Sequence, residues 1–108
     1  MTEHISITTT TDSAESAQSI AQHLLETHLA GCVQISAPIE SHYWWEGRIE
    51  LAREWRLTIK TRAALLPDVQ RSIAAVHPYK TPQILATSIV WGDAGYLQWL
   101  DDATTGKW

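Results

Sequence analysis

Two side chains in this 108-residue sequence pair a thiol with an imidazole, namely Cys32 and His77. Together they are donors suited to copper in its softer, monovalent state. The same pair could act as a nucleophile and its activating base, although the sequence names no third residue to orient the base. A structural interpretation stands beside both. A lone cysteine in a strand is more often a small packed residue, and His77 before Pro78 would fix the turn that ends a helix.

Cys32 is the only cysteine of the chain. It therefore cannot form an intrachain disulfide, and a Cys-rich zinc site built within one chain is excluded. A single thiol is consistent with a reducing compartment. It also argues against a dedicated copper chaperone, because carriers of that kind generally present a Cys-x-x-Cys pair.

Three further residues have side chains that a ligand could use. Lys60 could hold an anion, although a lysine that ends a strand is usually a solvated charge. Trp44 and Trp45 point to opposite faces if they lie on a strand, so at least one of them needs a neighbouring subunit or a ligand. The chain contains six tryptophans, more than a core of this size could hide. We therefore expect some of them at a subunit interface.

The strands that would position these residues follow from β-prone runs and from a period of two. Cys32 to Ile39 alternates cleanly, and a kink is expected at Pro38, which cannot donate to a sheet ladder. The chain then runs through Tyr43 into a hairpin turn at Glu46 and Gly47, where glycine permits a positive φ. The expected strands are 4–10, 32–39 with its extension to the turn, 49–59 and 83–91.

Three helices separate or follow these strands. Asp12 with Glu15 resembles a capping box at the start of the first helix, which should stop before Gly31. Pro67 is tolerable only in the first turn of the second helix, and His77 should end it. A short final helix follows Asp93. The order is βαββαβ plus a C-terminal helix, the α+β ferredoxin-like arrangement with a long hairpin between its second and third strands.

Length and composition restrict the classes of protein. A chain of 12.1 kDa fits one domain spanning residues 1–108, and an interface would add to its modest burial. No apolar run approaches the roughly 20 residues of a membrane-spanning helix, and the start MTEHISITTTT lacks the features of a secretory signal. The sequence thus predicts a cytoplasmic protein. A net charge of −4 without a Lys/Arg cluster argues against nucleic-acid binding.

Five ordered segments carry a resemblance to a known family. They are AGCVQI (30–35), YWWEG (43–47), IKT (59–61), HPYKTPQI (77–84) and YLQWL (96–100). In their order and spacing they resemble the CutA divalent-cation-tolerance family, and the likeness covers almost the entire chain.

The resemblance implies a homotrimer, as in the PII signalling proteins, in which the long hairpin reaches onto a neighbouring subunit. It implies a cleft between subunits that holds copper or another small ligand, with a role in ion tolerance or signalling rather than catalysis. By residue-to-residue match, Cys32 and His77 would be the metal ligands. Trp45, Lys60 and Tyr79 would be the ligand-binding residues.

The sequence departs from the family pattern beside that cleft. Lys80 and Gln83 stand where acidic residues are common, and Gln34 stands where asparagine is usual. The change removes hard anionic oxygen ligands and adds a repelling positive charge. It favours soft ions over Mg, Ca and Mn, and an anionic or neutral ligand over a divalent cation. The alternative function is a small hydrolase of the same fold that uses Cys32 and His77.

Overall fold

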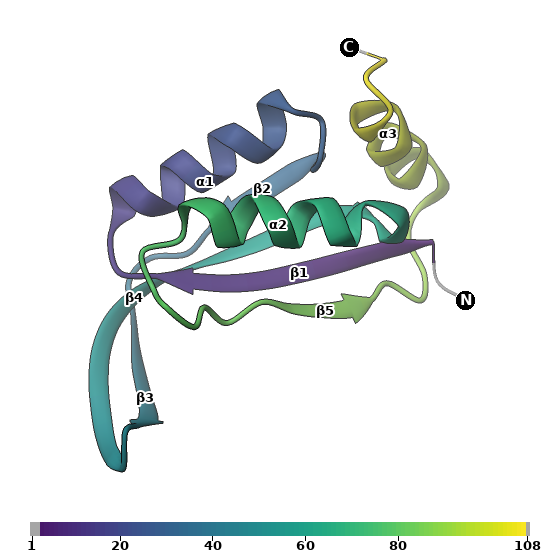
Figure 1. Cartoon of the computed structure of the whole chain (residues 1–108). Coiled ribbons are helices and arrows are strands. Elements are labelled where there is room, and N and C mark those ends of the chain that lie inside the picture. The colour runs from purple at the N-terminus through teal and green to yellow at the C-terminus, as the bar shows by residue number, and fades with distance from the viewer. Residues whose placement is uncertain (1–2, 108) are drawn as a thin grey trace.

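A computed structural model describes residues 3–107, and within them the strands form one five-stranded antiparallel sheet. Its order is β2-β4-β1-β5, and β3 extends the sheet by pairing with β4 alone (Figure 1). This arrangement confirms the predicted α+β order with its terminal helix. The elements are β1 (His4–Thr11), α1 (Ala14–Glu26), β2 (Cys32–Ile35), β3 (Ile39–Trp45), β4 (Arg48–Arg62), the 3-10 turn η1 (Ala63–Leu65), α2 (Leu66–Val76), β5 (Leu85–Ser88) and α3 (Ala94–Thr104).

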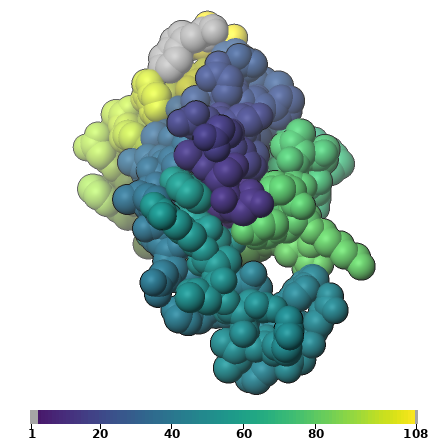
Figure 2. Space-filling view, turned by 90° about the vertical axis from the view of Figure 1, so that its left-hand side faces the viewer, coloured from purple at the N-terminus to yellow at the C-terminus, as the bar shows by residue number. Residues whose placement is uncertain are grey.

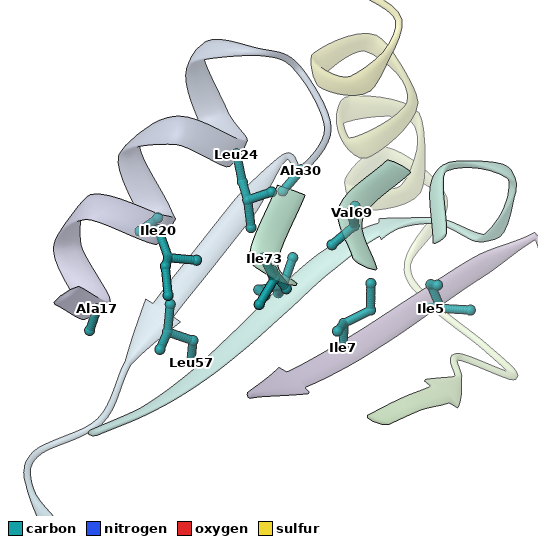
Figure 3. Packing of buried hydrophobic residues seen from close by; sticks show 11 residues of the cluster. Ile5, Ile7, Ala17, Ile20, Leu24, Ala30, Leu57, Val69 and Ile73 are labelled. Atoms are coloured by element: carbon teal, nitrogen blue, oxygen red, sulfur yellow. The ribbon is translucent and has the colours of Figure 1, made fainter. Parts of the chain in front are cut away.

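The hydrophobic core lies between one face of the sheet and the helices α1 and α2 (Figure 3). Alternation along β1 and β4 directs Ile7, Leu57 and Ile59 to this face, and all three are fully buried. Ile20 on α1 and Ile73 on α2 close the layer from above.

Helix ends follow the predicted chemistry with one correction. The cap of α1 is Ser13 rather than Asp12, because the Ser13 hydroxyl accepts the Ser16 N–H at 3.0 Å. Pro67 lies in the first turn of α2, and His77 ends that helix in an extended conformation. The final helix α3 begins after Asp93 as expected, and Asp93 caps it, since its carboxylate accepts two N–H groups of the first turn.

The predicted second strand is interrupted as expected near Pro38. Its two parts are β2 and β3, and both pair with β4. Ile35 lies opposite Leu57 and Ile39 opposite Glu54, so three residues (36–38) separate the two pairs on one side and only two (55 and 56) on β4. The extra residue makes a bulge, which bends the hairpin away from the body of the molecule. Its turn has positive φ at Glu46 and Gly47, the pair of angles of a two-residue hairpin loop.

The predicted fourth strand is shorter than expected, because β5 covers Leu85–Ser88 instead of 83–91. Its partner β1 begins at His4, whose carbonyl accepts the Ile89 N–H at 3.0 Å. Beyond that point the described part of the chain, residues 3–107, offers β5 no further strand for pairing. Val90 and Trp91 consequently leave the sheet and are exposed at 91% and 79%.

The final helix α3 contacts polar side chains at the start of β1 and the end of β4. His4 Nε2 lies 2.8 Å from Asp101 Oδ1, and Arg62 Nε donates to Thr104 Oγ1 at 2.8 Å. Gly31 permits the close approach, because a Cβ there would lie 2.5 Å from Leu100 Cδ1. The helix therefore packs beside the start of β2 and the end of β4. This end of the sheet is far from the hairpin turn (Figure 1).

Candidate functional site

A cleft of about 640 Å³ separates the hairpin from the segment that follows α2. Figure 2 shows this hollow between the teal hairpin and the green segment. Tyr43, Trp44 and Trp45 of β3 lie on one side. The other side is supplied by Tyr79, Lys80, Thr81 and Gln83. Thr10, Ser41, His42 and Glu54 complete the lining.

The two sides of the cleft are tied together by one hydrogen bond. The Tyr79 hydroxyl donates to Glu54 Oε2 at 2.7 Å. Glu54 is only 5% exposed, although it lies on the long strand β4 at the base of the hairpin. Burial, reinforced by the hydrogen bond to this carboxylate and by its charge, raises the pKa of Tyr79 above its usual range. The tyrosine therefore stays protonated and remains a donor at neutral pH.

His77 contacts Tyr79 and fixes its orientation. Its Nδ1 accepts the Tyr79 backbone N–H at 3.1 Å, and its Nε2 lies 2.8 Å from the Thr10 carbonyl oxygen. A carbonyl can only accept, so Nε2 donates this second hydrogen bond while Nδ1 accepts the first. The two rings also contact each other, with centroids 4.9 Å apart. Both ring nitrogens of His77 are thus already used in holding this turn.

Cys32 and Lys60 lie elsewhere, on the face of the sheet opposite the hydrophobic core. They are directly opposite each other on β2 and β4, and Lys60 Nζ donates to Gln34 Oε1 at 3.1 Å. Burial raises the pKa of Tyr96 on α3, and the nearby Cys32 raises it further. Cys32 is therefore partly covered by α3, and neither it nor Lys60 lines the cleft.

The structure therefore brings Trp45 and Tyr79 together but separates Cys32 from His77 within one chain. Cys32 lies opposite Lys60, which lies opposite Ser6, whereas His77 contacts Thr10 four residues further along β1. Two strand spacings and four residues of rise place roughly 16 Å between the backbones of Cys32 and Thr10. The hydrolase alternative thus has no nucleophile–base contact inside a single chain.

The residues present do not fit a metal centre within one chain. Across residues 3–107, no three His, Cys, Asp or Glu side chains are grouped so that they could hold an ion. His77 has no free ring nitrogen to offer while it holds its turn. Cys32 and His77 are too far apart in one chain to bind the same ion. A site that uses both side chains must therefore take Cys32 from one chain and His77 from another.

Sequence reasoning missed Glu54, the buried carboxylate that lines the cleft. Its neighbours Arg53 and Trp55 on β4 do not mark it as special, and Glu50 on the same strand is an acid of the same kind in the sequence. One signal in the sequence could have pointed to Glu54, which is an acidic residue within a predicted strand. It lies opposite Ile39, where the bulge next to Pro38 shifts the pairing of β3 with β4. Only the tertiary contact with Tyr79 shows that this acid is buried at the cleft.

Comparisons of sequence and of structure with known proteins identify the same family. A profile of the family described as CutA1 divalent ion tolerance protein matches residues 5–103. The divalent-cation tolerance protein CutA of Archaeoglobus fulgidus is 43% identical over 99 residues, covering 92% of this chain and 96% of the relative. A solved structure from that organism, described as a periplasmic divalent cation tolerance protein, has a TM-score of 0.91 at 42% identity, covering 94% and 98% of the two chains.

Two further relatives show the range of the similarity. The structure of CutA1 from the psychrotrophic bacterium Shewanella sp. SIB1 has a TM-score of 0.93 at 37% identity, covering 95% of this chain and 96% of its own. The chloroplastic CutA 1 of Oryza sativa is 38% identical over 95 residues, which are 88% of this chain. The chain spans about half the length of that plant relative, 54%.

Proposed function

The chain belongs to the CutA1 family of divalent ion tolerance proteins, and from this membership we propose that it is a homotrimeric binding protein rather than an enzyme. Its ligand, a metal ion or a small molecule, lies in the cleft beside the hairpin, which neighbouring subunits complete. A signalling role belongs to the same proposal, because a ligand between the hairpin and the body would change how the hairpin is held.

The exposed apolar surface of the hairpin carries this proposal. Trp44, Ile49 and Leu51 are exposed at 72%, 66% and 61%, although they lie on a regular pair of strands. The hairpin projects from the body (Figure 1), and a two-stranded ribbon with uncovered apolar side chains is marginal in water. Such a surface is typical of a contact with another protein chain. We assign that contact to Trp44 and the ligand contact to Trp45.

Sedimentation of the purified chain tests the assembly. The expected mass is about three times the 12.1 kDa of one chain. Trp44→Ser with Ile49→Ser should shift the protein toward monomer, whereas Trp91→Ser, which removes an equally exposed tryptophan outside the hairpin, should leave the trimer intact. A monomeric wild-type chain at micromolar concentration would exclude the proposed trimer.

Soft-metal binding is the second part of the proposal. It depends on Cys32, and because the Cys32 of one chain lies outside that chain's cleft, a neighbouring subunit would have to supply the thiol. The thiol suits Cu(I) and other thiophilic ions, whereas Lys80 and Gln83 offer no anionic oxygen to a hard cation. Family membership supports a role in tolerance of divalent ions, and the Cys32 thiol favours thiophilic ions among them in addition to monovalent copper. A competition titration with a chelator of known affinity measures the binding.

Location stays a prediction. None of the helices within residues 3–107 is long and apolar enough to cross a membrane. One solved relative is described as periplasmic, so the cytoplasmic location predicted from the sequence needs its own measurement. Fractionation of the native host with antibodies against the chain provides it.

A further inference from the structure

Glu54 is a carboxylate without a cationic partner among the described residues. Across residues 3–107 no Lys, Arg or His nitrogen lies within 4.0 Å of it, and the donor it has is the Tyr79 hydroxyl. Its exposed fraction is 5%. A carboxylate removed from water costs free energy unless it is paired and hydrogen-bonded, and one neutral hydroxyl is a small compensation.

The surroundings of this carboxylate suit an organic cation. Tyr43 and Trp45 line the same cleft, and each is exposed at about two fifths of its surface, 41% and 42%. Aromatic faces attract ammonium groups, and the attraction is strongest where water is excluded. A buried negative charge beside exposed aromatic rings therefore complements a positive charge attached to an apolar chain.

We propose that the cleft binds a protonated organic amine, with its ammonium group at Glu54 and its apolar part against Tyr43 and Trp45. The inference rests on the proposed function, because it identifies the ligand class of the same cleft. It reverses the expectation drawn from Lys80 and Gln83, which favours an anionic or neutral ligand. Lys80 is exposed at the edge of the cleft, where water screens its charge, whereas Glu54 is shielded from water.

Glu54 favours a cationic ligand and Lys80 an anionic one, so the charge of the preferred ligand shows which residue dominates. NMR titrations of the wild-type chain with n-butylammonium and with n-butyrate compare a cation and an anion of similar length. The cation should bind more tightly and shift the resonances of Trp45 and Tyr79. Glu54→Gln should weaken it by about ten-fold or more, the usual loss for a hydrogen bond to a charged group. Lys80→Gln should tighten it by about two- to five-fold, the scale of an exposed charge.

Glu50→Gln is the matched control, because Glu50 lies on the same strand and its loss changes the net charge equally. It does not line the cleft, so the affinity for butylammonium should stay within about two-fold of wild type. If Glu54→Gln fails to fold, judged by circular dichroism, the exposed Lys80→Gln variant still decides the sign. Butyrate binding more tightly than butylammonium would overturn the inference, as would an unchanged affinity in a folded Glu54→Gln chain.

Sedimentation separates this inference from the proposed trimer. A monomer that binds butylammonium in a Glu54-dependent way would retain the inference and exclude the trimer. A trimer that prefers butyrate would retain the assembly and exclude the amine.

Discussion

The hydroxyl of Tyr79 and the carboxylate of Glu54 join two segments that are 25 residues apart in the sequence, across a hydrogen bond of 2.7 Å. Tyr79 follows α2, and Glu54 lies where the hairpin leaves the body of the sheet. The bond therefore sets the separation of the two sides of the cleft. It also gives a buried negative charge a donor that belongs to the protein.

Removing this donor should destabilise the fold. Tyr79→Phe leaves Glu54 Oε2 without its hydroxyl, and we expect the free energy of unfolding to fall by about 1–3 kcal/mol at pH 7. Urea unfolding followed by circular dichroism measures the change. Tyr43→Phe is the control, since no hydrogen bond joins the Tyr43 hydroxyl to another of the described residues, and its loss should cost less than about 0.5 kcal/mol. Equal losses in both variants would show that the contact with Glu54 is not what matters.

Alkaline pH should act through the same tyrosine. The pKa of Tyr79 is raised in the folded chain above the value of about 10 that it has when unfolded. Its contribution to stability is therefore complete below pH 10 and is lost as the pH rises through and beyond that value. The unfolding free energy of wild type should fall more steeply between pH 9 and 11 than that of Tyr79→Phe. Parallel slopes would contradict the raised pKa.

Gly31 should not accept a side chain. A Cβ there would meet Leu100 Cδ1 at 2.5 Å and Ala103 Cβ at 3.4 Å, and Leu100 is fully buried. We expect Gly31→Ala to lower the unfolding free energy by about 1–3 kcal/mol through overpacking. The cost should shrink in a Leu100→Ala background, which opens the space. A full cost in that background would assign the effect to the backbone of Gly31 instead.

Copper binding should depend on Cys32 more than on His77. Cys32→Ser removes the soft donor and should abolish Cu(I) binding in the competition titration. His77→Ala should mainly lower stability, because the ring holds the Thr10 carbonyl and the Tyr79 N–H. Comparable losses of affinity in both variants would indicate a site shared between chains. Mg, Ca and Mn should bind negligibly, and Lys80→Glu with Gln83→Glu should strengthen Cu(II) binding if missing carboxylates are the reason for weak binding.

Most of the element order could be predicted because its signals are local. The alternation after Cys32, the break at Pro38 and the turn at Gly47 each depend on residues within a few positions of one another. The length of β5 could not be predicted in the same way. Residues 89–91 are as apolar as a strand, but pairing ends where β1 begins, and that limit belongs to the partner strand.

The sequence by itself determined the order of the helices and strands and most of their residues, because backbone propensity, capping and hydrophobic period act over one or two turns. The spacing of its motifs also determined the family. Only the tertiary structure decided which chemical groups meet. It placed Cys32 under α3, joined Trp45 with Tyr79 in one cleft, and buried Glu54 there. Such contacts depend on register, on a bulge and on packing between distant segments, and these set burial and charge at the cleft without leaving a local pattern in the sequence.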